Sequence, residues 1–178
     1  MNDITMTSRL LDYPCGTPPE GGVVLPVADG VFWIRMPLPF PPTHINMWLL
    51  RDGGGWTVVD TGIRSSKVQG LWNRIFATAL DGKPITRLIC THFHPDHSGL
   101  AGWLGEHWQA PLWMSQAEWL NGRLQGADAL PAIPGDVLAY YERAGYSERM
   151  MQAAWTRTLD NFAKLTTPLP RAYRRITD

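Results

Sequence analysis

The hydrophobic period of the chain changes at Ser65, and this change constrains the fold more than any other feature. Before it, the apolar runs INMWLL and WTVVD flank a glycine turn at residues 51–55, which is typical of a β-hairpin. After it, apolar residues recur at helical spacing over residues 68–80, which predicts an amphipathic helix. The apolar run at residues 85–90 then predicts a buried strand. Strands that alternate with a helix in this way indicate an α/β fold.

Two further β segments flank this region. Residues 23–36 read as two short strands around a turn at 28–30, and the proline-rich run PLPFPPT follows them at 37–43. The short run PLWM at 111–114 comes after the expected strand and helix. The β segments therefore occupy the first two thirds of the chain.

The later part of the chain is predicted to be mostly helical, over residues 115–165. Ser115 and Glu118 have the spacing of a capping box, in which each side chain bonds the other residue's backbone N–H. Asp136 and Ser147 are placed to cap two further helices. This helical segment could cover a substrate cleft, although its apolar stripes are explained equally well by ordinary packing.

Composition narrows the class of protein. The 178 residues are 44% hydrophobic, enough for the core of the single domain that we expect over residues 1–178. Lys plus Arg and Asp plus Glu number 16 each, which argues against a nucleic-acid partner. The sequence has no apolar run long enough for a membrane span, and we expect a cytoplasmic protein. In a reducing compartment Cys15 and Cys90 would be free thiols, with Cys90 in the core rather than acting as a nucleophile.

The stretch THFHPDHSG, residues 91–99, gathers four side chains that can bind a metal: His92, His94, Asp96 and His97. If the chain is still extended here, alternate residues project to one face about 6 to 7 Å apart, so His92 and His94 can converge on one ion. Three imidazoles and a carboxylate favour zinc. Iron and manganese are alternatives, because the cluster contains no thiolate that would select one metal over the others.

The residues around Pro95 are expected to shape this cluster. Proline disfavours helical geometry in the residue before it, so His94 should be extended. Asp96 is predicted at the N-cap of a helix whose apolar residues run from 100 to 108, with His97 in its first turn. The cluster would then lie where a strand passes into a helix, a common place for chemistry in α/β folds.

The cluster matches the H-x-H-x-D-H signature of the metallo-β-lactamase superfamily, and the sequence VVDTG at residues 58–62 resembles a second motif of that family. The resemblance covers residues 23–115 and implies an αββα sandwich, of which this chain would form the N-terminal half. It also implies two metal ions, the first bound by His92 and His94 and the second by Asp96 and His97. Asp60 would then support the ligands through hydrogen bonds.

The ligand set implied by this resemblance looks incomplete. His107 is expected about 15 Å along the same helix, too far away to be a ligand, and near the helix C-terminus, where a histidine is favourable. His44 could contact a substrate or a metal, or it could be a surface histidine at the start of a strand. We therefore expect the chain to be the N-terminal part of a longer protein, with an exposed apolar face that could promote self-association.

The resemblance also implies a reaction. We expect hydrolysis of an ester-like bond in a small-molecule substrate by metal-activated hydroxide, which Asp96 would orient as the catalytic residue. His97 next to Asp96 resembles the hydroxyacylglutathione hydrolase-like and lactonase-like branches, which favours a thioester or a lactone. Two alternatives stay open: a non-catalytic metal-binding module or inactive fragment, and a di-iron redox protein.

Overall fold

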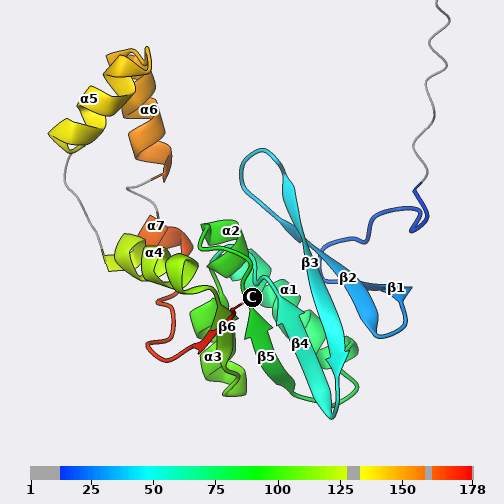
Figure 1. The fold of residues 1–178 in the computed structure, drawn as a ribbon. Coiled ribbons are helices and arrows are strands. Elements are labelled where there is room, and N and C mark those ends of the chain that lie inside the picture. The colour runs from blue at the N-terminus through cyan, green and yellow to red at the C-terminus, as the bar shows by residue number, and fades with distance from the viewer. Residues whose placement is uncertain (1–12, 128–132, 159–161, 178) are drawn as a thin grey trace, which may run out of the picture.

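The computed structural model describes residues 13–127, 133–158 and 162–177, and for residues 154–158 it describes only the helical backbone. Seven strands form one sheet in chain order, β1-β2-β3-β4-β5-β6-β7 (Figure 1). The strands are β1 Val24–Ala28, β2 Val31–Pro37, β3 His44–Asp52, β4 Gly55–Val59, β5 Ile85–Ile89, β6 Leu112–Met114 and β7 Arg174–Arg175. The helices are α1 Ser66–Thr78, α2 Pro95–Ser98, α3 Ala101–Trp108, α4 Gln116–Ala127, α5 Gly135–Arg143, α6 Glu148–Thr158 and α7 Phe162–Leu165.

The sheet changes from antiparallel to parallel at β4. Strands β1 to β4 pair antiparallel, whereas β4 to β7 pair parallel. Parallel neighbours need a crossover connection, and α1 supplies it between β4 and β5. The α/β fold class and the hairpin at residues 51–55 are therefore confirmed.

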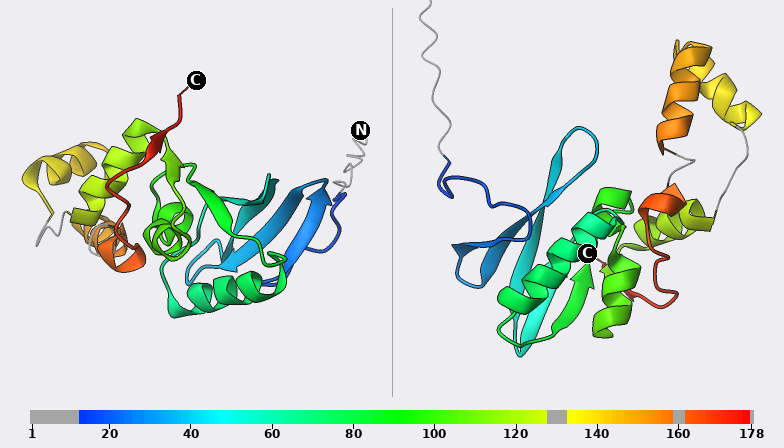
Figure 2. Two further views of the ribbon diagram at one scale, coloured as in Figure 1. Left: turned by 90° about the horizontal axis from the view of Figure 1, so that it is seen from below. Right: turned by 180° about the vertical axis from the view of Figure 1, so that it is seen from behind.

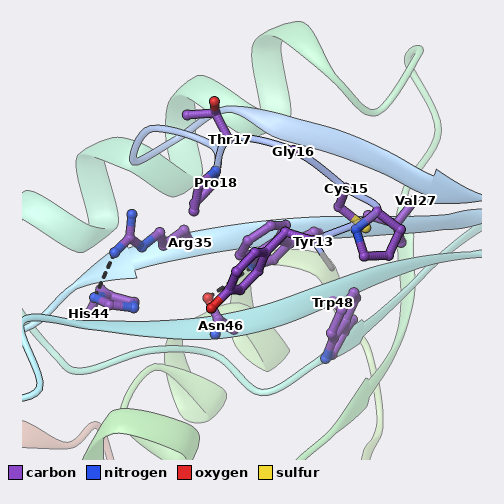
Figure 3. A pocket seen from close by; sticks show the side chains of 12 residues that line it. Tyr13, Cys15, Gly16, Thr17, Pro18, Val27, Arg35, His44, Asn46 and Trp48 are labelled. Carbon is purple, nitrogen blue, oxygen red and sulfur yellow. Dashed lines mark hydrogen bonds between the residues drawn. The ribbon is translucent and has the colours of Figure 1, made fainter. Parts of the chain in front are cut away.

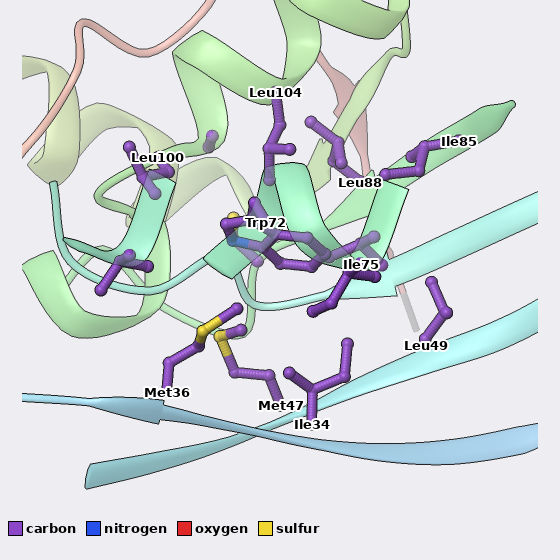
Figure 4. Close-up of a cluster of buried hydrophobic side chains, with 14 of the residues drawn as sticks. Ile34, Met36, Met47, Leu49, Trp72, Ile75, Ile85, Leu88, Leu100 and Leu104 are labelled. Carbon is purple, nitrogen blue, oxygen red and sulfur yellow. The ribbon is translucent and has the colours of Figure 1, made fainter. Parts of the chain in front are cut away.

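One face of the sheet is buried under helices, and α1 lies across it (Figure 2). Trp72 and Ile75 of α1 are fully buried, as are Ile34 of β2 and Met47 of β3 (Figure 4). Leu104 of α3 joins the same cluster. The apolar residues that recur at helical spacing over residues 68–80 thus lie at the centre of the core.

The opposite face carries a row of apolar residues that runs from strand to strand. The pairing registers connect one residue on each of six neighbouring strands, and none of the six is buried. The row consists of Leu25, Trp33, Trp48, Val59, Ile89 and Trp113. Trp48 is exposed and the other five are half-buried, so the apolar face that was expected to be exposed is exposed only in part.

The region after the histidine cluster differs from the prediction. His94, not Asp96, is the N-cap, and Pro95 occupies the first helical position, where its fixed φ suits a helix start. The helix α2 ends at Ser98, and Leu100 has φ −105° and ψ 9° before α3 begins. The single predicted helix is therefore two helices, α2 and α3, and Asp96 lies in the first turn of α2.

The helix caps predicted further along are partly confirmed. The Ser115 hydroxyl accepts the backbone N–H of Glu118 at 3.3 Å, and the Ser147 hydroxyl accepts that of Met150 at 3.4 Å. The prediction for Asp136 was wrong, because α5 begins after Pro134 and places Asp136 in its first turn.

The helical segment predicted at residues 115–165 separates into two parts. α4 and α7 contact each other, and α7 also contacts α2, which carries part of the histidine cluster. α5 and α6 pack together and project away from the sheet, and no residue of α5 is buried (Figures 1 and 2). In the described part of the chain, no helix is long and apolar enough to cross a membrane.

Candidate metal centre

Asp60 follows β4 and connects that strand to the histidine loop. Its φ of 63° is in the left-handed region, which Asp tolerates better than most residues, and its backbone N–H donates to the Ile89 carbonyl at 2.8 Å. Its buried carboxylate accepts the Thr91 N–H at 2.8 Å and the Thr91 hydroxyl at 2.9 Å. The ends of the parallel strands β4 and β5 are thereby joined at the cluster.

Thr61, the next residue, fixes the short helix α2. Its backbone N–H and its hydroxyl both donate to the His97 carbonyl, at 2.7 and 2.9 Å. The hydroxyl also accepts the Leu100 N–H at 3.1 Å, and the Thr61 carbonyl accepts from the Trp72 indole at 2.9 Å. The Asp-Thr-Gly segment after β4 therefore orients α2 against the core helix α1.

Gly99 allows three backbone segments to meet behind the cluster. A Cβ atom there would overlap the Pro95 carbonyl oxygen and would lie 2.8 Å from the carbonyl oxygens of Gly62 and Leu165. The Gly99 carbonyl accepts the Thr167 N–H at 2.6 Å. A side chain at this position would separate α2 from both neighbouring segments.

The outer nitrogens of two histidines are held by hydrogen bonds. Nδ1 of His97 lies 2.8 Å from Asp60 Oδ2, and Nδ1 of His92 lies 3.0 Å from the Thr91 hydroxyl. The carboxylate can only accept, and the Thr91 hydroxyl donates its proton to it, so both Nδ1 atoms act as donors. In the neutral form of either ring the lone pair is then on Nε2, as a metal ligand requires.

Each of these Nε2 atoms faces a polar atom of another residue in the cluster. Nε2 of His92 lies 3.1 Å from Nδ1 of His94, and Nε2 of His97 lies 3.5 Å from Asp96 Oδ2. The rings of His92 and His97 have centroids 3.8 Å apart, so the two pairs adjoin. Burial lowers the pKa of His92, and the nearby His97 and His94 lower it further. The neutral, metal-binding form of His92 is thereby favoured.

The fit of a metal ion can be tested on these distances. Zinc binds histidine nitrogens at about 2.0–2.1 Å, so two nitrogens 3.1 Å apart can both reach one ion. The donors form two facing pairs, and among the described residues no group of three or more His, Cys, Asp or Glu side chains is arranged to hold a metal. The types of side chain therefore suit a metal ion, whereas the described geometry brings only two metal-binding atoms together at a time.

The structure brings together all five residues that the sequence analysis singled out for this centre. It corrects how two of them are placed, since β5 ends at Ile89 and the segment His92–His94 is a bend rather than the end of a strand. The extended conformation expected for His94 before Pro95 is observed, with φ −53° and ψ 145°. The assignment of these residues as metal ligands stays a prediction.

The other two histidines lie elsewhere. His107 is in the last turn of α3, as expected, and its ring stacks on Phe76 with centroids 5.2 Å apart. His44 accepts a hydrogen bond from Arg35 at 2.8 Å and lines a cavity of about 780 Å³ on the open face of the sheet, with Trp33 and Trp48 (Figure 3). The described contacts of both histidines are thus outside the cluster.

Cys90 is a core residue, as predicted. It is 1% exposed, and burial, with a further contribution from the negative charge of Asp60, raises the pKa of its thiol well above the usual value. Cys15 is exposed, and neither cysteine is in a disulfide.

Several residues that hold the centre together were not found by sequence reasoning. Thr91 orients His92, and the Ser98 hydroxyl donates to the Phe93 carbonyl at 2.6 Å. Glu118 accepts the Phe93 N–H at 2.9 Å, although the sequence suggested only a helix cap for it. Thr91 and Ser98 adjoin the cluster in sequence, whereas nothing local distinguishes Glu118 from an ordinary capping residue.

Comparison with known proteins decides the family. The sequence matches the metallo-beta-lactamase superfamily over residues 40–166, most of the chain. The chain belongs to this superfamily. Its members are mostly hydrolases that bind metal ions, usually zinc. A search of the curated proteins found no match.

Two solved structures extend this result. A beta-lactamase domain protein from Burkholderia ambifaria is 40% identical, with a TM-score of 0.77, and the match covers 94% of this chain and 48% of that one. A metallo-beta-lactamase family protein from Thermus thermophilus is 20% identical, with a TM-score of 0.64, covering 86% of this chain and 48% of that one. This superfamily chain therefore spans about half the length of each of these two proteins.

Proposed function

We propose that the chain carries metal ligands of a metallo-beta-lactamase superfamily hydrolase that cleaves a thioester or a lactone. The observation that supports this most directly is the arrangement of atoms that can bind a metal in two facing pairs. One pair is Nε2 of His92 with Nδ1 of His94, and the other is Nε2 of His97 with Oδ2 of Asp96. The outer nitrogens of His92 and His97 are held so that their metal-binding atoms face inward.

His92 and His94 would hold one ion, and Asp96 and His97 a second. A bound zinc ion would supply a Lewis acid and make a nucleophile available from water at neutral pH. Asp60 keeps the His97 ring in one orientation, and Asp96 is the partly exposed carboxylate of the centre, able to orient the attacking water. The first role follows from the hydrogen bond to His97 Nδ1, and the second from the partial exposure of Asp96.

Metal analysis tests the first part of this proposal. The protein would be purified without added metal, and its zinc, iron and manganese would be measured by mass spectrometry beside a His94→Ala variant. We expect bound zinc that the variant loses, because the variant leaves Nε2 of His92 without its facing donor. His107→Ala is the matched control, since His107 packs on Phe76 away from the cluster. Equal metal in the protein and in His94→Ala would refute the proposal.

Hydrolysis assays test the second part. Thioester and lactone substrates would be offered to the zinc-loaded protein, and Asp96→Asn would be compared with it at equal metal content. We expect turnover that falls at least about 100-fold in the variant, the usual size of a lost general base or orienting group.

A metal-binding module without turnover is the second candidate. It is favoured by the observation that the described donors come in pairs rather than in a group of three or more. Stoichiometric zinc together with no hydrolysis of either substrate class would support it over the hydrolase.

A further inference from the structure

Phe93 stands between the two histidines of the first pair, and both of its peptide groups are held by other parts of the chain. The N–H of Phe93 donates to Glu118 Oε2 at 2.9 Å, and its carbonyl accepts from the Ser98 hydroxyl at 2.6 Å. The peptide that joins His92 to Phe93 is therefore anchored to α4, and the peptide that joins Phe93 to His94 is anchored to α2.

Glu118 is well placed to hold this backbone. It lies in the first turn of α4, where its own N–H donates to the Ser115 hydroxyl and where a carboxylate is favoured by the helix dipole. Hydrogen bonds to an ionised acceptor are roughly twice as strong as neutral ones. The contact joins residues 25 positions apart, so it is a tertiary contact rather than a consequence of local turn geometry.

The same face of α4 also holds the Phe93 side chain. Gly122 lies one helical turn after Glu118 and is buried, and a Cβ atom there would be 3.4 Å from Phe93 Cβ. On another side the Phe93 ring lies near that of buried Phe162, with centroids 6.0 Å apart. The side chain of Phe93 is therefore held by packing, and its backbone by the hydrogen bonds to Glu118 and Ser98.

We propose that Glu118 is a positioning residue that sets the geometry of the first metal-binding pair. Its carboxylate fixes the His92–Phe93 peptide and thereby keeps Nε2 of His92 3.1 Å from Nδ1 of His94. The inference rests on the proposed function, because it concerns the same pair of ligands. Without the carboxylate, the two imidazoles would have to be ordered when the metal binds, at a cost in affinity.

Three variants test the proposal in the full chain. Glu118→Ala removes the acceptor, and Glu118→Gln restores a neutral one. Glu148→Ala is the matched control, since Glu148 is an exposed glutamate in the first turn of another helix, α6. Two quantities would be measured: hydrogen exchange of the Phe93 amide by NMR in metal-free protein, and the dissociation constant of zinc by competition with a chromophoric chelator. Thermal unfolding by circular dichroism would show whether each variant is folded.

We expect Glu118→Ala to speed exchange of the Phe93 amide and to weaken zinc binding about tenfold, the lower end of the usual effect of removing a group that orients a ligand. Glu118→Gln keeps an acceptor but not the charge and should recover part of both effects, and Glu148→Ala should change neither. Faster exchange with unchanged zinc affinity would overturn the positioning role, as would equal losses in Glu118→Ala and Glu118→Gln. If the unaltered protein and His94→Ala bind zinc alike, the proposed function itself fails, and this inference with it.

Discussion

Replacing Gly99 by alanine should destabilise the fold strongly, although the backbone conformation at this position suits any residue. Gly99 has φ −59° and ψ −34°, so the substitution creates no torsional strain. The added methyl group would instead meet three carbonyl oxygens, those of Pro95, Gly62 and Leu165. None of these is the tip of a flexible side chain, so the segments themselves must move apart.

The magnitude can be worked from these contacts. Overpacking typically costs about 1–3 kcal/mol, and three backbone contacts place Gly99→Ala near the upper limit. Movement of Gly99 also weakens its hydrogen bond from Thr167, a loss of about 1 kcal/mol. Gly99 lies between the two helices in an ordinary right-handed conformation, so alanine returns about 0.4–1 kcal/mol by restricting the unfolded chain. The free energy of unfolding should therefore fall by about 3 kcal/mol.

Urea denaturation followed by tryptophan fluorescence measures this change. Gly70→Ala is the matched control, because Gly70 is in the middle of α1 and a Cβ atom there meets nothing within 4 Å. That variant should gain about 0.5–1 kcal/mol. If the two variants unfold at the same urea concentration, the close approach at Gly99 does not exist in solution, and the account of how α2 is held would be wrong.

Two further results are expected. Iodoacetamide at neutral pH should label only Cys15 in the native protein and both cysteines in denaturant. The reason is that burial keeps the reagent away from Cys90 and raises the pKa of its thiol. Rapid labelling of two thiols in the native protein, measured by mass spectrometry, would contradict this. Thr61→Val should lower the free energy of unfolding by about 1–2 kcal/mol, since it removes the hydroxyl that donates to the His97 carbonyl. Thr78→Val, at an exposed position in α1, should have little effect in the same urea titration, and equal losses in both variants would argue against a special role for Thr61.

Elements with a strong hydrophobic period were predicted well from the sequence. The stripe at residues 68–80 corresponds to α1, Ser66–Thr78, and the run at 85–90 corresponds to β5, Ile85–Ile89. In both cases the spacing of the apolar residues within the segment itself predicts the element and its buried side, so no knowledge of distant contacts is needed.

The start of α2 was predicted wrongly for a local reason. Asp is a strong N-cap residue, and this preference favoured Asp96. Pro95 prevailed, because its fixed φ and missing N–H suit the first helical position. The N-cap is therefore His94, two residues earlier, and it has no side-chain cap.

The sequence by itself determined which donors are available, since His92, His94, Asp96 and His97 lie within six consecutive positions. Only the tertiary structure decided which atoms of those side chains are held by the rest of the fold. Nδ1 of His97 is bound by Asp60, 37 positions away, because β4 and β5 are parallel neighbours. The backbone between His92 and His94 is held by Glu118, 25 positions from Phe93, because α4 packs beside the loop. Contacts of this kind depend on how strands pair and helices pack, which the local preferences of the residues do not encode.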